Sequence, residues 1–301
     1  MMNNKLLVVV TGPTAVGKTS LSIELAKHFN TVIVSADSRQ FYKQLNIAVA
    51  KPDQNQLKEV EHHFISFLDI ADYYNVAQFE TDVLQKLDEI FAEKDIAFLV
   101  GGSGLYIDAV CYGIDYFPDV PDDLRNSLNK IFEQKGIEEL RKILKEKDPE
   151  YYNIVDKDNP QRLLRAIEVC LITGKPFSEQ RLNEPKKRNF NIIKIALNMD
   201  RAVLNERISV RVDEMLDAGL IDEAKELYKH KELNSLKTVG YRELFDYIEG
   251  KYTIEEAVEK IKTNTRRYAK RQVTWLKKDE SYKWFSPEQK EVIIDHIKSN
   301  M

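Results

Sequence analysis

Residues 6–19 read LLVVVTGPTAVGKT. The first part is a continuous Val-rich run, which favours a strand buried on both faces of a parallel sheet. The second part fits G-x-x-x-x-G-K-[ST], in which glycines let the backbone wrap around phosphate oxygens and N–H groups at a helix N-terminus face the anion. A chance match in an ordinary strand–turn–helix is the alternative. The motif in this context predicts a phosphate cradle made of Gly12, Pro13, Thr14, Ala15, Val16, Gly17, Lys18 and Thr19.

Two side chains give this cradle its chemistry. Lys18 adds a point charge, and the hydroxyl of Thr19 can ligate Mg²⁺. P-loop NTPases also place an Asp at the end of an apolar strand to organise Mg²⁺. Here the apolar run IAFLV at 96–100 ends in the glycine-rich turn 101–104, which has no carboxylate. The cradle is therefore predicted to hold a diphosphate that is not ATP, and a small-molecule kinase stays as an alternative.

Strand and helix patterns alternate beyond the cradle. TVIVS at 31–35 and IAFLV at 96–100 predict strands, with a helical pattern over 76–93 between them. This alternation predicts an α/β fold with a P-loop doubly wound parallel sheet. We expect residues 1–115 to form the first part of this core and 116–190 a mostly helical insertion. Residues 191–301 would complete the core, through the strand NIIKIAL at 191–197, and add a basic C-terminal region. This region would be helical over 201–278 and is punctuated by Gly219, Gly240 and Gly250.

The composition bounds the class of protein. The chain has 301 residues, 43% of them hydrophobic and 31% charged, which is typical of a globular protein of one large or two ordinary domains. The longest apolar run, 6–10, is too short to span a bilayer, and no secretory leader is evident, so we expect a cytoplasmic protein. Cys111 and Cys170 cannot form a disulfide framework or a metal knuckle. His62 and His63 lack partner ligands for zinc.

A carboxylate is predicted to face the cradle. The second strand pattern runs into SADSRQ at 35–40. Because the carboxyl ends of neighbouring parallel strands line one crevice, Asp37 would lie near the cradle, and Ser103 would reach the same crevice. A carboxylate there can remove a proton from an attacking nucleophile. The alternative for Asp37 is a helix cap or turn residue.

Positive charge is concentrated in one segment of an acidic chain. The net charge is −4, yet residues 260–278 carry eight basic side chains and no acidic one. We expect one face of this helix, through Ile261, Tyr268 and Gln272, to pack on the domain, with Trp275 in the core. The opposite face would present Lys262, Arg266, Lys270 and Lys277 to a polyanion. A merely solvated helix face is the alternative.

Eight motifs in order resemble one known family. The chain resembles the tRNA dimethylallyltransferases, which prenylate the adenosine next to the anticodon, over nearly its whole length. The matching motifs are GPTAVGKT (12–19), SADSRQFY (35–42), HH (62–63), VGGSGLY (100–106), NPQRLLRA (159–166), RVDEM (211–215), VGYRE (239–243) and YAKRQVTW (268–275).

The resemblance implies a reaction and its substrates. Dimethylallyl diphosphate would donate its prenyl group to N6 of the adenosine 3′ of the anticodon, with release of diphosphate and with Mg²⁺ as cofactor. The implied catalytic residues are Asp37 as base, with Ser103 and Arg211 at the leaving group. No membrane and no obligate protein partner is expected. The implied tRNA-binding residues are Asp37, Ser38, Arg39, Gln40, Ser103, Arg125, Gln161, Arg162, Leu163, Leu164, Arg165, Lys237, Gly240, Tyr241, Arg242, Lys270, Arg271 and Lys277.

The chain departs from the family pattern at two places. The family often has DIGTAKP where residues 46–52 read NIAVAKP, so Ala48 and Val49 replace Gly and Thr, and no role of that Thr hydroxyl carries over. Ser103 stands where the family usually has Thr, and keeps the hydroxyl. Three alternatives remain open: a prenyltransferase that acts on free adenine nucleotides, a P-loop kinase, and a non-enzymatic RNA-binding protein.

Overall fold

The structure is a computed structural model, and it describes residues 5–181 and 184–301. The chain divides into two compact units. The first contains Met1–Cys111 and Lys187–Met301, and the second contains Tyr112–Lys186. The sequence-based boundaries for the helical insertion were 116–190. Its two ends meet at a backbone hydrogen bond of 2.7 Å from Lys186 N to Tyr112 O.

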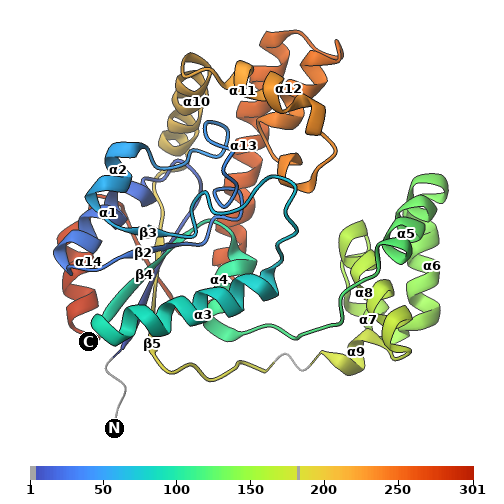
Figure 1. The fold of residues 1–301 in the computed structure, drawn as a ribbon, viewed down its shortest axis with the longest axis horizontal. Coiled ribbons are helices and arrows are strands. Elements are labelled where there is room, and N and C mark those ends of the chain that lie inside the picture. Colours follow the sequence, from blue (N-terminus) through green and yellow to red (C-terminus); the bar gives the residue numbers. More distant parts are fainter. Residues whose placement is uncertain (1–4, 182–183) are drawn as a thin grey trace. The chain divides into compact units, whose positions relative to one another are not determined.

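The first unit is built on a parallel sheet, which confirms the predicted fold class (Figure 1). Its strand order is β3-β2-β4-β1-β5-β6, and every described pair is parallel. Central β1 is buried along its whole length, as a Val-rich run between two neighbours requires. The strands are β1 (Leu6–Thr11), β2 (Ile33–Ser35), β3 (His62–His63), β4 (Ile96–Gly101), β5 (Asn191–Leu197) and β6 (Tyr282–Phe285).

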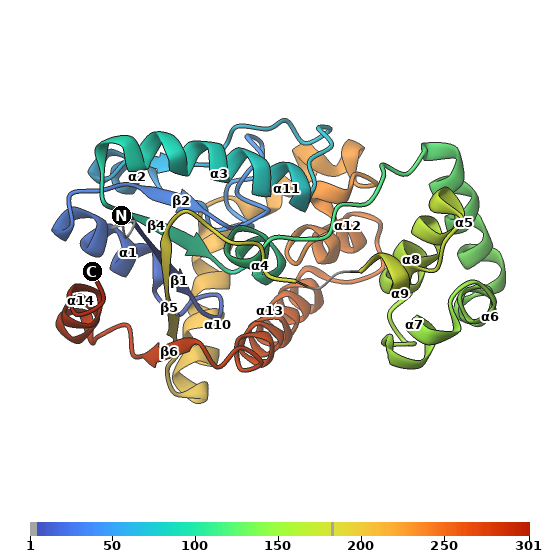
Figure 2. The same cartoon turned by 90° about the horizontal axis from the view of Figure 1, so that it is seen from below.

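Side chains along a strand point alternately to the two faces of the sheet, so the apolar side chains on each face must be covered by helices. Leu6, Val8 and Val10 of β1 belong to one core cluster with apolar residues of α1, α10 and α14. In both overall views α3 runs alongside the strands (Figure 2). The helices of this part are α1 (Lys18–His28), α2 (Gln54–Glu59), α3 (Val76–Glu93), α4 (Gly104–Tyr112) and α14 (Lys290–Lys298).

The C-terminal helical region is more broken than the sequence pattern indicated. We predicted helix over 201–278 with breaks at Gly219, Gly240 and Gly250, and the structure also has segments outside α-helix between Leu227 and Tyr241. Gly219 and Gly240 have φ values of 98° and 100°, which a continuing helix does not allow. The elements are α10 (Arg201–Asp217), α11 (Leu220–Leu227), η1 (Tyr228–His230), η2 (Asn234–Leu236), α12 (Tyr241–Ile248) and α13 (Ile254–Leu276).

The second unit is helical and has its own core. Buried Asp148 links its short elements: it caps α7 by accepting from Tyr151 N at 2.8 Å, and it accepts from Ser178 N at 2.6 Å. Both α7 and α8 begin with proline at their N-termini, where the missing N–H costs no intrahelical bond. The helices are α5 (Asp122–Lys135), α6 (Ile137–Lys147), α7 (Pro149–Ile154), α8 (Pro160–Thr173) and α9 (Phe177–Gln180). Among the residues described in either unit, no helix combines the length and the apolarity that crossing a membrane requires.

Candidate active site

The phosphate cradle lies between β1 and α1, and its shape depends on two glycines. Gly12 has φ 154°, and a Cβ there would come 2.6 Å from the carbonyl oxygen of Leu197, so only glycine lets the loop pass the end of β5. Gly17 has φ 104° and precedes α1. Lys18 Nζ donates to the carbonyl oxygens of Gly12 and Pro13 at 3.0 and 2.9 Å. Burial lowers the pKa of Lys18 to about 8, although the charge of Asp37 acts in the opposite direction.

Asp37 is a turn residue and also faces the cradle, so both sequence-based alternatives describe it. Its Oδ1 accepts from Arg39 N at 3.2 Å, two residues along the turn. Burial raises the pKa of Asp37 above its usual value of 3.8, and the charges of Lys18 and Arg211 partly oppose this rise. The carboxylate therefore belongs to one charged cluster with Lys18, Arg39 and Arg211.

Arg211 enters this cluster from α10. The helix packs through Ile208 and Val212, which are buried, and this holds Arg211 half-buried between them. Burial lowers the pKa of Arg211, while Asp37 and Glu214 oppose that shift. A cationic side chain that has lost part of its hydration is well suited to bind an anion.

Ser103 joins the turn after β4 to the turn after β2. Its Oγ accepts from Ser38 N at 3.0 Å and donates to Ser38 Oγ at 3.2 Å. Its backbone N donates to Ala36 O at 3.2 Å. The crevice predicted from the strand order therefore brings Asp37 and Ser103 to one place, as the carboxyl ends of parallel strands must.

Gln272 is a site residue that the sequence analysis placed on a packing face and in the motif YAKRQVTW, without a role at the cradle. Its Oε1 accepts from Thr14 N at 2.8 Å, and its Nε2 donates to Gly102 O at 3.1 Å. The side chain thus connects the cradle with the turn after β4, and it is only 8% exposed. A polar residue within an otherwise apolar helix stripe is the signal that could have indicated this role.

Glu223 was also missed, and it holds the loop at which the chain departs from the family pattern. Its carboxylate accepts from the backbone N–H groups of Asn46, Ile47 and Ala48 at 2.9–3.1 Å and from Tyr241 Oη at 2.7 Å. Nothing in the sequence near Glu223 indicates these partners.

Gln40 holds the same loop from the side of the Asp37 turn. Its Nε2 donates to the carbonyl oxygens of Val49 and Ala50 at 3.3 and 3.1 Å. The side chain of Arg39 also binds a backbone carbonyl, because its Nη1 donates to Asn234 O at 2.7 Å. The turn 37–40 is therefore anchored on two sides.

Two of the four cations predicted on the exposed face of α13 and its end, Lys270 and Lys277, are exposed, and the other two are not. Lys262 forms an ion pair of 2.7 Å with Asp213, and Arg266 donates to Ser209 at 2.8 Å, so both half-buried side chains bind α10. Tyr268, expected to pack, is 37% exposed. The exposed cations of the helix and its end are Lys260, Arg267, Lys270, Arg271, Lys277 and Lys278. Trp275 is half-buried against Gly104, where an added Cβ would meet its ring at 2.4 Å.

Three residues implied as tRNA contacts have buried side chains. Leu163 and Leu164 lie in the core of the second unit, and Tyr241 is 0% exposed. Their side chains cannot touch a ligand at the surface, so they serve the fold instead. Gly240 is also buried, with the Ala48 Cβ 3.2 Å from where its own Cβ would be.

The remaining implied contacts lie at or near the surface. Gln161 and Arg162 at the start of α8, and Lys237 and Arg242 in the first unit, are exposed. Arg125 and Arg165 both pair with Glu168, at 3.5 and 3.7 Å.

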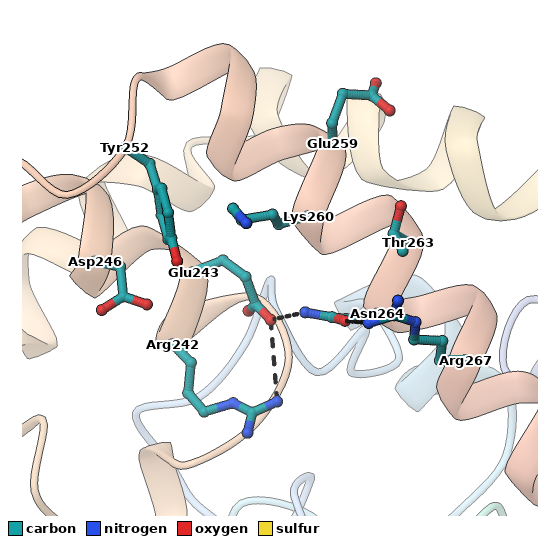
Figure 3. A pocket seen from close by; sticks show the side chains of 9 residues that line it. All are labelled: Arg242, Glu243, Asp246, Tyr252, Glu259, Lys260, Thr263, Asn264 and Arg267. Carbon is teal, nitrogen blue, oxygen red and sulfur yellow. Dashed lines mark hydrogen bonds and ion pairs between the residues drawn. The ribbon is translucent and has the colours of Figure 1, made fainter.

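A separate polar pocket of about 480 Å³ lies between α12 and α13 (Figure 3). Glu243 Oε1 accepts from Asn264 Nδ2 at 2.7 Å, and the Nη2 of Arg242 lies 4.0 Å away. The pocket shares none of the cradle residues, and its three basic and three acidic side chains balance. Its lining residues are Arg242, Glu243, Asp246, Tyr252, Glu259, Lys260, Thr263, Asn264 and Arg267.

Comparison with known proteins places this chain in a family. The family model described as IPP transferase matches residues 40–279. The chain belongs to the IPP transferase family. This confirms the resemblance inferred from the motifs.

Named relatives and solved structures match over most or all of the chain. A tRNA dimethylallyltransferase of Christiangramia forsetii is 50% identical over 301 residues, covering 100% of this chain and 99% of the relative. A full-length tRNA isopentenylpyrophosphate transferase from Bacillus halodurans has a similar structure, with a TM-score of 0.73, 35% identity and coverage of 98% and 96% of the two chains. A eukaryotic dimethylallyltransferase acting on tRNA also has a TM-score of 0.73, at 28% identity and 90% and 70% coverage.

Proposed function

We propose that the chain transfers a dimethylallyl group from dimethylallyl diphosphate to N6 of the adenosine 3′ of the anticodon of a tRNA, with release of diphosphate. The observation that carries this proposal is the cluster of Asp37, Lys18 and Arg211 at the cradle, which combines one base with two anion-binding cations. The names of the relatives support tRNA as the substrate.

The cradle holds the donor by its diphosphate. The N–H groups at the start of α1 and the charge of Lys18 face the phosphate oxygens. On donor binding Lys18 exchanges its two carbonyl partners for the anion, because an anionic acceptor makes the stronger hydrogen bond. Arg211 and the Ser103 hydroxyl add donors on the side of the leaving group.

Transfer is a substitution at the allylic carbon. The N6 lone pair forms the new C–N bond as the C–O bond to the diphosphate breaks, and that electron pair leaves on the diphosphate oxygen. The proton of N6 passes to Asp37, whose raised pKa makes it a stronger base than an exposed Asp. The adenine must leave its stack to reach this crevice.

A Mg²⁺ ion fits this donor set as a ligand of the diphosphate. Among residues 5–181 and 184–301, no cluster of three or more His, Cys, Asp or Glu residues can hold a metal alone. Mg²⁺ is commonly bound by substrate phosphates together with one or two protein oxygens, and the Thr19 hydroxyl would be the protein ligand here. When bound, the ion would neutralise charge on the leaving diphosphate.

The tRNA binds exposed cations by its phosphates. Lys270 and Arg271 of α13 and Lys277 directly after it belong to the first unit, together with Lys237 and Arg242. Gln161 and Arg162 add polar contacts on the second unit. Contacts of this kind recognise the phosphate backbone and the shape of the RNA, whereas the target base is recognised separately in the crevice.

Labelled dimethylallyl diphosphate, incubated with either tRNA or AMP, tests the proposal. Label in the tRNA, at N6 of the adenosine 3′ of the anticodon, is expected. Label in AMP instead would favour a prenyltransferase for free adenine nucleotides, and phosphoryl transfer from ATP would favour the kinase.

A further inference from the structure

Gln272 occupies the space between the cradle and the turn after β4. It reaches there from α13, 258 residues along the chain from Thr14, whose backbone N–H it binds at 2.8 Å. Its other end binds Gly102 O at 3.1 Å. A Cβ at Gly102 would come 2.3 Å from Gln272 Nε2, so the glycine turn and the glutamine side chain fill one narrow space together.

This space has a defined role in P-loop NTPases. There Mg²⁺ bridges the last two phosphates and is held by the P-loop hydroxyl and by an Asp at a second strand end, so the terminal phosphate lies between the P-loop and that strand end. In this chain β4 pairs with β1 up to Thr11 and Gly101, where the cradle and the Gly101–Ser103 turn begin. Gln272 lies between these two segments.

We propose that Gln272 restricts the cradle to a diphosphate by filling the volume that a third phosphate would need. The proposal rests on the proposed function, because it assumes that the cradle binds the donor's diphosphate. The amide also uses the N–H of Thr14, which leaves one backbone donor fewer for an additional phosphate group.

A glutamine suits this role better than a charged or apolar residue of similar size. Its carbonyl end accepts from Thr14 and its NH₂ end donates to Gly102, so both buried backbone groups are satisfied. A carboxylate could not donate to the Gly102 carbonyl, and a neighbouring phosphate would repel it. The neutral amide excludes by volume without weakening the binding of the diphosphate.

Binding of inorganic diphosphate and tripolyphosphate with Mg²⁺, measured by calorimetry on the full chain, tests the proposal. Tripolyphosphate carries more negative charge, so charge alone favours it at a basic cradle. We expect the unmodified chain to bind diphosphate at least ~10-fold more tightly than tripolyphosphate, a difference of about 1.4 kcal/mol in binding free energy. In Q272A the affinity for tripolyphosphate should rise, so that the ratio of the two affinities falls by ~10-fold or more.

Two further variants separate volume from a structural role. Q272M keeps most of the side-chain volume but loses both hydrogen bonds, so it should keep the preference for diphosphate even if both affinities fall. T274A, which removes an exposed hydroxyl bonded only within α13, should match the unmodified chain. A general loss of structure would lower both affinities and would not raise the affinity for tripolyphosphate.

The possible results distinguish the two proposals. Equal binding of both anions by the unmodified chain, or the same ratio in Q272A and Q272M, would overturn the role of Gln272 and leave the donor site standing. Failure of the unmodified chain to bind either anion would instead remove the donor site, and with it the proposed function.

Discussion

Asp37 meets two requirements at one position. It closes a turn through its own Oδ1, and it faces Lys18 and Arg211. The turn holds the carboxylate in a fixed orientation, which a general base needs in order to act without reorganisation. A variant that keeps the turn but loses the base can separate these requirements.

D37N is that variant. An Asn Oδ1 can still accept from Arg39 N, so we expect the fold and the affinity for tRNA to be kept. Single-turnover prenyl transfer should fall by about 10²–10⁴-fold, the usual contribution of a general base. D37A should lose as much activity. An unchanged transfer rate in D37N would show that another group takes the proton.

The pKa shifts of Asp37 and Lys18 predict a bell-shaped pH profile. Asp37 must be deprotonated to act, and because its pKa is raised, kcat/KM should already fall with decreasing pH above the usual Asp value of 3.8. Lys18 must be charged to bind phosphate, and its pKa is about 8 in the free protein, so donor affinity should fall as the pH rises through about 8.

The pH dependence of kcat/KM and of donor Kd checks both limbs. In K18A, the decrease in donor affinity near pH 8 should be absent, and in D37N the acidic limb should be absent. A donor affinity that stays constant as the pH rises through about 8 would contradict the role of Lys18, and an acidic limb that persists in D37N would contradict the role of Asp37.

Among the elements, α11 contributes to the site through one carboxylate. Glu223 receives three backbone N–H groups of the loop 46–48 and the hydroxyl of Tyr241. The next two residues of the chain, Val49 and Ala50, accept from Gln40 Nε2 in the turn of Asp37. The helix, the loop and the turn are thus connected through side-chain to backbone bonds.

E223Q tests this connection. The NH₂ end of the new amide cannot accept a hydrogen bond, so at least one backbone N–H of the loop loses its partner. We expect the free energy of unfolding to fall by about 1–3 kcal/mol. E226Q on the exposed face of the same helix should change it by less than about 0.5 kcal/mol. Denaturant unfolding measures both, and equal stabilities would show that the loop does not depend on Glu223.

At the scale of the whole molecule, the local distribution of charge matters more than the total. The chain has a net charge of −4, yet the end of α13 presents Lys270, Arg271 and Lys277 to solvent. An acidic protein with such a basic surface is steered toward polyanions in one orientation, because nearby charges dominate within a Debye length.

Replacing these three cations with Gln should weaken tRNA binding and reduce its salt dependence. Each lost phosphate contact removes roughly one unit from the slope of log K against log salt. Binding of inorganic diphosphate should stay the same, because these side chains do not form the cradle. Titrations of tRNA at several salt concentrations measure the slope, with K298Q on α14 as the control. A slope equal to that of the unmodified chain would place the tRNA on another surface.

The sequence by itself determined the sheet, the cradle and the family. A Val-rich run followed by glycines at fixed spacing and a helix predicts a phosphate site within residues 6–19, and β1 and β5 follow the predicted ranges closely. The family blocks also identified Asp37, Ser103 and Arg211, and the structure brings Asp37 and Arg211 into one charged cluster. The short β3 and β6 were not predicted, because two and four residues show no period that a sequence pattern can register.

Only the tertiary structure decided how distant side chains share the site. Gln272 meets Thr14 across 258 residues, and Glu223 meets Ile47 across 176, and no local pattern encodes either pair. The sequence pattern also does not show which cations of α13 are exposed. Lys262, Arg266 and Lys270 all belong to the same basic segment, but the first two bind α10, whereas Lys270 is exposed to solvent. Helical period fixes which residues share a face, while the neighbouring elements fix which face is covered.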